Sequence, residues 1–213
     1  MSLGLGSNLS KSGLVTPGII TDSLVLKHKY DAASVVPISD GAAYFDGTDD
    51  YIDLGTKALA GDDVSISVWI YLTTSQVSGI LSYGDIIFRL NSDTNIRWFA
   101  DKDGTSSSVT ITSALNRWTH IGVSSDDGVT SFYQDGVLLE TETDTTLGND
   151  SIASYIGRTG TDYFPGYICN LGFWSSTKTQ AQIKSIMNKN YAGLSDSEKT
   201  NLVSWWNLDS DYI

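Results

Sequence analysis

Hydrophobic and polar residues alternate along most of the chain after residue 41, and this period of two predicts β-strands. The clearest run is VSISVWIYL, residues 64–72, in which valine, isoleucine or leucine occupies every second position. That face predicts a sandwich core. The opposite face, which carries Trp69 and Tyr71, predicts a sheet surface that is partly exposed or covered. Further strand-like runs follow at 79–83, 85–90, 96–100, 108–111, 118–124, 130–134, 137–140, 154–158 and 167–174.

Turn sequences separate these runs. Asp-Gly occurs at residues 103–104, 127–128 and 135–136, and Gly160 and Pro165-Gly166 mark two further expected turns. Asp-Gly between alternating strands is the strongest short-range hairpin signal. The pattern predicts an all-β fold: an antiparallel β-sandwich of jelly-roll type over residues 41–213.

The end of the chain changes its period. Ile183, Ile186 and Met187 share one helical face within residues 179–190, which predicts a short amphipathic helix. Residues 195–198, Ser-Asp-Ser-Glu, form a capping box that opens a second helical turn, and residues 201–209 then predict a final strand. We therefore expect one or two short C-terminal helices.

Residues 1–40 have no sustained period and predict an extended N-terminal arm. The segment is too polar to bury a core of its own, yet it is more apolar than a free linker requires. We expect this arm to dock on a sister subunit or on a capsid surface by adding a strand to an exposed sheet edge. The apolar residues expected to make this contact are Leu14, Val15, Ile19, Ile20, Leu24 and Leu26.

Composition excludes several classes of partner. The net charge of -12 argues against binding to nucleic acid or to an anionic membrane surface. The single cysteine, Cys169, excludes an internal disulfide, and its apolar neighbours predict a buried structural thiol. No run approaches the roughly 18 apolar residues of a membrane span. The first residues lack the features of a signal peptide, which predicts synthesis in a cytoplasm without secretion by that route.

Five motifs occur in an order that resembles a known family. They are Phe45-Asp46-Gly47 with Tyr51-Ile52, the long run Val64 to Tyr71, Trp118-Thr119-His120-Ile121, Phe132-Tyr133-Gln134-Asp135-Gly136, and the closing set of Ile156-Gly157-Arg158, Phe164-Pro165-Gly166-Tyr167-Ile168 and the helix with Ile183. Together they resemble the laminin-G-like jelly rolls of the concanavalin A-like lectin/glucanase superfamily over residues 41–190. The resemblance implies the fold but no single function, because this fold hosts lectins, hydrolases and structural modules.

Two positions depart from that family. A Trp-x-Leu-Asp strand opens the domain in many members, whereas Trp206-Asn207-Leu208-Asp209 closes this chain. Cys169 stands where the family usually has aspartate in its closing strand. Either the strand order is permuted, or the last strand serves an interface or a domain that does not follow.

A second resemblance concerns the arm. Residues 16–28, TPGIITDSLVLKH, are similar to the leaders of jelly-roll proteins encoded by tailed bacteriophages. This resemblance implies a non-enzymatic virion structural or capsid decoration protein, made in the host cytoplasm and located in the virion as a homo-oligomer or bound to a capsid protein. The alternative is a free carbohydrate-binding module or adhesin that recognises a cell-surface glycan.

Aromatic residues at strand ends and in loops are candidates for sugar stacking. These ligand-binding candidates are Tyr83, Trp98, Tyr163 and Phe164. Each is equally explained as a residue of the core or of an interface.

Acidic residues of the first turn are candidates for a structural Ca²⁺ site, which needs carboxylate and carbonyl oxygens on loops. They are Asp46, Asp49 and Asp50, and Asp209 joins them if the last strand pairs nearby. The competing explanation is turn formation, since Asp bonds readily to its own backbone. No cofactor is expected to be required.

Catalysis is the remote alternative. A glycoside hydrolase needs two carboxylates facing one sugar, and Glu140 and Glu142 are the only alternating pair of glutamates. They lie in a polar run without interleaved aromatic residues, which favours a solvated strand end. The chain has two histidines, and His120 within a strand is expected to be structural. The sequence therefore predicts a protein that is not an enzyme.

Overall fold

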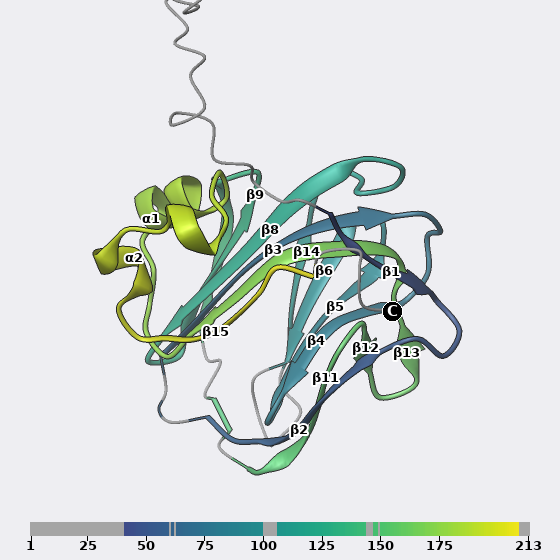
Figure 1. The fold of residues 1–213 in the computed structure, drawn as a ribbon, viewed down its shortest axis with the longest axis horizontal. Helices are drawn as coiled ribbons and strands as arrows, with labels where there is room; N and C mark the ends of the chain where they lie inside the picture. The colour runs from purple at the N-terminus through teal and green to yellow at the C-terminus, as the bar shows by residue number, and fades with distance from the viewer. Residues whose placement is uncertain are drawn as a thin grey trace, which may run out of the picture. The chain divides into compact units, whose positions relative to one another are not determined.

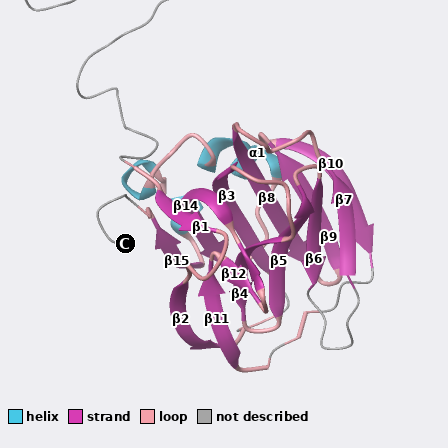
Figure 2. Ribbon diagram, turned by 90° about the vertical axis from the view of Figure 1, so that its right-hand side faces the viewer, coloured by secondary structure: helices cyan, strands magenta, loops and turns pink. Residues whose placement is uncertain are grey.

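Two antiparallel sheets stack face to face and form a β-sandwich (Figure 1). The computed structural model describes residues 41–59, 61, 63–99, 106–143, 147–148 and 150–208. The predicted arm, with all six of its contact residues, lies outside the described residues. Strands make up most of the described domain and the helices lie at one end of it (Figure 2). The predicted jelly-roll-like sandwich with short C-terminal helices is confirmed.

The first sheet has the strand order β1-β14-β3-β8-β9-β10, and β15 also pairs with β14. Its strands are β1 (Ala43–Asp46), β3 (Val64–Leu72), β8 (Trp118–Asp126), β9 (Val129–Gln134), β10 (Val137–Thr143), β14 (Pro165–Trp174) and β15 (Leu202–Trp206). The alternating run 64–72 is β3 itself, at the middle of this sheet. Asp127 and Asp135 take positive φ values of 42° and 50° at the hairpin turns that Asp-Gly predicted.

The second sheet has the order β2-β11-β4-β5-β6-β7. Its strands are β2 (Ile52–Lys57), β4 (Ser78–Tyr83), β5 (Ile86–Ser92), β6 (Asn95–Phe99), β7 (Ser106–Thr110) and β11 (Ile152–Ile156). A separate hairpin of β12 (Arg158–Thr159) and β13 (Asp162–Tyr163) packs against β4. The sequence did not predict this hairpin, because residues 154–158 read as one strand.

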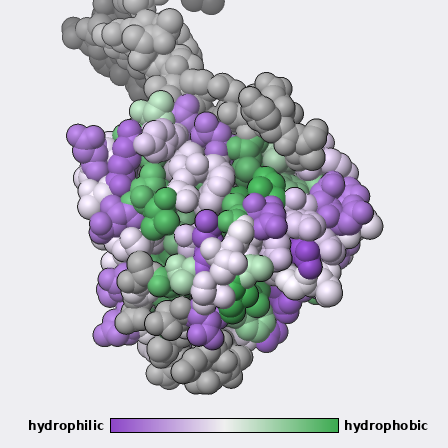
Figure 3. All heavy atoms as spheres, turned by 60° about the horizontal axis from the view of Figure 1, so that its bottom comes forward, coloured by the Kyte–Doolittle hydropathy of each residue, from purple (hydrophilic) through white to green (hydrophobic). Residues whose placement is uncertain are grey.

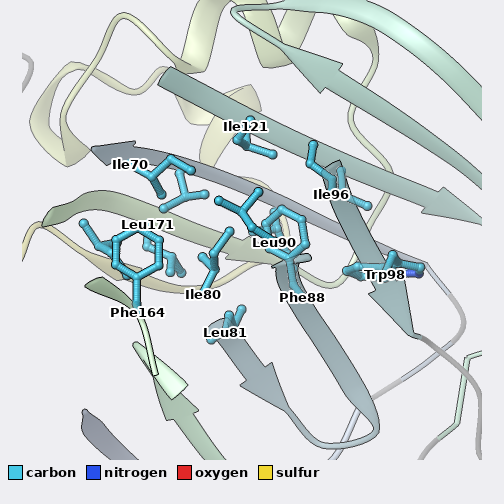
Figure 4. Packing of buried hydrophobic residues seen from close by; sticks show 14 of the residues in the cluster. Ile70, Ile80, Leu81, Phe88, Leu90, Ile96, Trp98, Ile121, Phe164 and Leu171 are labelled. Atoms are coloured by element: carbon cyan, nitrogen blue, oxygen red, sulfur yellow. The ribbon is translucent and has the colours of Figure 1, made fainter. Parts of the chain in front are cut away.

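The core lies between the sheets, where the alternating residues of both inner faces meet (Figure 4). Ile70 of β3, Leu90 of β5 and Ile121 of β8 are fully buried there. This burial is the main force that holds the sandwich together, since the chain's single cysteine, the buried Cys169, cannot form a disulfide within the chain.

The closing strand completes the first sheet. β1 pairs with one half of β14, with Ala43 opposite Ile168, and β15 pairs with the other half, with Trp206 opposite Leu171. Because both strands are antiparallel to β14, they run in the same direction along one edge of it. The predicted final strand is confirmed, and its place is in this sheet.

Two short helices follow β14. They are α1 (Gln180–Ile186) and α2 (Asp196–Lys199), and a 3₁₀ turn, η1 (Tyr191–Gly193), lies between them. Thr179 and Ser195 each make the capping box that fixes the start of a helix. Ile183 packs over Gly122 of β8, where any side chain on Gly122 would come within 3.0 Å of it. The helical segment therefore covers part of the outer face of the first sheet.

The expected turn at Pro165-Gly166 is wrong, because both residues belong to β14. Gly166 has φ +142°, and a Cβ there would lie 2.0 Å from the carbonyl oxygen of Tyr71. The glycine is needed for close approach of two backbones rather than for a change of direction. In the described part of the chain, no helix is long and apolar enough to cross a membrane.

Candidate functional site

Four aromatic residues form one row across four neighbouring strands of the first sheet. Tyr44 of β1 lies opposite Tyr167 of β14, Tyr167 opposite Tyr71 of β3, and Tyr71 opposite Trp118 of β8. Residues that face each other across antiparallel strands point to the same side of the sheet. Their neighbours in the strands point into the core, so this aromatic row lies on the outer face.

The rings of the row contact each other in sequence. The ring centroids of Tyr44 and Tyr167 are 5.0 Å apart, those of Tyr71 and Tyr167 are 6.0 Å apart, and those of Tyr71 and Trp118 are 5.7 Å apart. Tilted and edge-to-face contacts at these distances hold aromatic side chains in fixed orientations. Tyr44, Trp118 and Tyr167 are nevertheless 46%, 42% and 37% exposed. The row is thus both rigid and open to solvent.

The neighbouring row of the same face is covered. Trp69 is the residue of β3 next on that face, and its Nε1 donates a hydrogen bond to the carbonyl of Met187, just after α1. His120, opposite Trp69, is fully buried and lies 2.8 Å through Nε2 from the hydroxyl of Ser67. Burial lowers the pKa of His120 to about 3, so the ring stays neutral at physiological pH. This histidine is structural, as the sequence predicted.

A shallow cavity of about 440 Å³ lies along the uncovered part of the face. Its lining residues are Tyr71, Thr73, Asn116, Trp118 and Tyr167. The lining combines aromatic rings with a hydroxyl and an amide and carries no ionisable acid or base other than tyrosine. Such a lining suits a neutral polar ligand with apolar faces.

Three of the four calcium candidates come together beside this row. Asp46 is the last residue of β1, and its carboxylate, with those of Asp49 and Asp50, offers oxygens that lie within 4.8 Å of one another. The backbone N–H groups of Thr48 and Asp49 donate to Oδ1 of Asp46 and lower the pKa of its carboxyl. These bonds are those of a tight Asp turn. Asp209 lies outside the described residues, and bound calcium stays a prediction.

Three of the four predicted stacking residues are buried. Trp98 and Phe164 are fully buried and Tyr83 is 6% exposed, so their rings offer no surface to a sugar. Trp98 lies against Phe88 in the core (Figure 4). Tyr83 stacks on Phe173, with the ring centroids 4.2 Å apart. Trp98 is buried because side chains alternate between the two faces of β6, and Ile96 and Trp98 share the inner face.

Tyr163 is the predicted stacking residue that stays accessible. It lies at the β12–β13 hairpin, next to Tyr51, whose ring also contacts that of Tyr155. The guanidinium of Arg158 lies over the rings of Tyr51, Tyr155 and Tyr163, at 4.8, 4.9 and 5.4 Å. Cation–π contacts of this kind hold the arginine in place.

Glu140 and Glu142 lie on β10 at the edge of the first sheet, and Glu140 is exposed. Neither glutamate belongs to the cavity at the aromatic row. The placement is that of a solvated edge strand, in which charged residues discourage pairing with other chains.

The aromatic row was not predicted as a site. The sequence showed that Trp69 and Tyr71 share a face, but 123 positions separate Tyr44 from Tyr167, and only the strand register brings them together. On the face shown in Figure 3, hydrophobic residues form patches interrupted by polar ones.

Comparison with solved structures supports the fold. A Bacteroides ovatus protein described as a carbohydrate-binding protein aligns with 82% of this chain at 21% identity and a TM-score of 0.65. This chain spans about half of that protein, 53% of its length. A heptameric SAP-like pentraxin from Limulus polyphemus aligns with 72% of this chain and 84% of its own, at 16% identity and a TM-score of 0.57.

A third structure is domain 4 of AbnA, a GH43 extracellular arabinanase from Geobacillus stearothermophilus, in complex with arabinotriose. It aligns with 72% of this chain and 81% of its own, at 19% identity and a TM-score of 0.53. No curated protein sequence matches the chain. The family described as concanavalin A-like lectin/glucanases superfamily matches residues 46–184, and the chain belongs to this superfamily.

Proposed function

We propose that the protein is a non-catalytic carbohydrate-binding module whose ligand is a neutral glycan lying along the aromatic row. One observation carries this proposal: Tyr44, Tyr167, Tyr71 and Trp118 are in register across four strands, and all of them except the half-buried Tyr71 are exposed. A row fixed by strand pairing is a preformed site, so binding costs little ordering of the protein.

The chemistry of the row fits a sugar chain. Aromatic rings pack against the apolar faces of sugar rings, and tyrosine and tryptophan add hydrogen-bonding groups at their edges. Thr73 and Asn116 in the adjoining cavity offer a hydroxyl and an amide to sugar hydroxyls. The absence of Asp, Glu, Lys and Arg from this lining favours a neutral ligand. The structures that resemble the fold include a carbohydrate-binding protein and a domain in complex with arabinotriose, which is consistent with the proposal.

A glycan array followed by calorimetry tests this function. The full chain should bind one class of neutral oligosaccharide. Trp118→Ala should reduce its affinity at least about tenfold, because it removes an aromatic ring that the bound glycan would cover. Tyr191→Ala is the matched control, since Tyr191 is 49% exposed and lies outside the row. An array without any bound neutral glycan, or a Trp118→Ala variant with unchanged affinity, would contradict the proposal.

The location of this module on a virion stays a prediction from the sequence. Its display on a bacteriophage particle depends on residues 16–28, which lie outside the described residues. Mass spectrometry of purified particles from the source should find the protein at high copy number. If the protein is missing from particles but binds glycans as a free chain, the module acts as a lectin or adhesin without a virion role.

A further inference from the structure

Two arginines lie opposite each other on the outer face of the second sheet. Arg89 of β5 faces Arg97 of β6, while their neighbours Phe88 and Trp98 point into the core. Both guanidinium groups lie over the ring of Phe99, at 5.0 Å and 4.7 Å from its centroid. Arg89 and Arg97, here called the arginine pair, are therefore held in place by the strand register and by one aromatic ring.

The arginine pair has one carboxylate for two positive charges. Asp162 of β13 forms an ion pair with Arg89. Arg97 donates from Nη2 to the hydroxyl of Ser106 at 2.8 Å, and among the described residues no carboxylate lies within ion-pair distance of it. Like charges directly opposite each other across two strands destabilise a sheet. Among the residues that the structure describes, one positive charge of the pair thus has no carboxylate partner.

Burial raises the cost of this charge. The Nε atoms of Arg89 and Arg97 are both buried, and neither has a hydrogen-bond partner among the described residues. The side chain of Arg89 is 22% exposed, so the pair is partly withdrawn from water. Desolvated charge favours a counter-ion more strongly than exposed charge does. A bound anion would offset both the repulsion and the desolvation.

Apart from Asp162, the described surroundings of the arginine pair include fixed neutral polar groups. On one side, the β12–β13 hairpin sits against Gly79 of β4, where a Cβ would lie 2.3 Å from the backbone nitrogen of Thr159. On the other side, Asn95 accepts hydrogen bonds through Oδ1 from Asn91 and from Ser108. Hydroxyl and amide groups beside a guanidinium match the hydroxyls and the carboxylate of an acidic sugar.

We propose that the arginine pair is a second binding site, specific for a sugar residue that bears a carboxylate. The planar fork of Arg97 donates hydrogen bonds to the two carboxylate oxygens, and Arg89 adds the second positive charge while Asp162 fixes its position. The net charge of -12 repels polyanions at longer range, so the ligand carries a single charge or few charges. This site lies on the other sheet from the aromatic row and goes beyond the neutral-glycan function.

A ligand-observed NMR titration of the full chain with methyl β-glucuronide and with its uncharged methyl ester tests the site. The two probes share the sugar ring and differ only at the carboxyl group, which the ester caps with a methyl group, so binding of the sugar ring at the aromatic row is common to both. The acid should bind about tenfold or more tightly than the ester, because hydrogen bonds between charged groups are the stronger ones. Equal affinities, or no binding of the acid at millimolar concentration, would overturn the proposal whatever neutral glycans do on the array.

Substitutions locate the site. Arg97→Gln should abolish the difference between acid and ester, and it should fold normally, since the change lies on the outer face of the sheet and glutamine can still donate a hydrogen bond. Arg97→Lys keeps the charge without the planar fork and should retain only a part of the difference. Arg158→Gln is the matched control, because Arg158 also stacks on aromatic rings but lies outside the pair. A preference for the acid that survives in Arg97→Gln, or that is lost in Arg158→Gln, would place the anion elsewhere and overturn the assignment.

Discussion

The ammonium nitrogen of Lys189 lies 2.7 Å from each carboxylate oxygen of Glu198. The same glutamate closes the capping box of α2, and its carbonyl accepts a hydrogen bond from the indole of the buried Trp174 at 2.7 Å. The pair therefore ties the C-terminal helical segment to β14, the strand that also carries Tyr167. This attachment keeps the helices over one half of the outer face and leaves the aromatic row uncovered.

Glu198 should make stability depend on pH in acid. Burial acts to raise its pKa, but hydrogen bonds from Lys189, Ser185 and Ser195 outweigh burial and hold the pKa at about 2, below the ordinary 4.5. The stabilising contribution is complete above pH 4.5 and is lost as pH falls from 4.5 to 2, by up to about 3 kcal/mol. Urea unfolding across this range should show the loss. Glu198→Gln should flatten this part of the profile, whereas Glu140→Gln, at an exposed edge position, should leave it unchanged.

His120 should make the free energy of unfolding depend on pH in a higher range than Glu198 does. Its pKa of about 3 in the folded protein, against 6.5 when unfolded, means that the unfolded chain takes up a proton first as pH falls. Stability is complete above pH 6.5 and decreases toward pH 3, with a limiting slope of about 1.4 kcal/mol per pH unit. His120→Gln keeps a partner for Ser67 and does not titrate. Its unfolding free energy should therefore change less between pH 6.5 and 4.5, and a slope equal to that of the wild type would exclude the histidine as the cause.

Truncation of Trp98 should mainly lower stability, whereas truncation of Trp118 should mainly weaken glycan binding. Trp98→Ala removes a fully buried ring and should lower the free energy of unfolding by about 3–5 kcal/mol. Trp118→Ala removes a ring that is 42% exposed, so it should cost about 1 kcal/mol or less while it weakens glycan binding. Denaturant titration and calorimetry on both variants check the contrast. If Trp98→Ala unfolded no more easily than Trp118→Ala, the burial of β6 described here would be wrong.

Gly79 should be intolerant of a side chain. A Cβ there would lie 2.3 Å from the nitrogen of Thr159 and 2.6 Å from the carbonyl oxygen of Asp162, both backbone atoms of the β12–β13 hairpin. Gly79→Ala should therefore destabilise the domain by about 1–3 kcal/mol. Gly61→Ala is the matched control, because a Cβ at Gly61 meets nothing within 4 Å. A thermal melt that separates the two variants supports the packing of the hairpin on β4.

Local patterns were sufficient for most of the strands but not for the β12–β13 hairpin, the start of β14 or the site. The alternation of residues 64–72 matches β3, and Asp127 and Asp135 stand at hairpin turns because Asp-Gly tolerates positive φ. The aromatic row depends on pairing between distant strands, and no local pattern specifies the register of Tyr44 against Tyr167. Trp98 is wrong as a stacking candidate for a different reason: it alternates with Ile96 on the inner face of β6, and this face, rather than its position near the end of the strand, decides its burial.

The N-terminal arm offers the test that separates a docked module from a free one. Residues 1–39 are too irregular to repay their own ordering entropy, about 1–2 kcal/mol of backbone per residue, yet they include apolar residues such as Ile19 and Ile20. On the prediction that the arm docks on a sister subunit or a capsid surface, deletion of residues 1–39 should leave a folded sandwich with unchanged glycan binding. Light scattering and particle-binding assays should show that oligomers or attachment are lost. An unfolded truncation would place the arm in the core of its own domain, and normal assembly of the truncated protein would show that the arm has no role in docking.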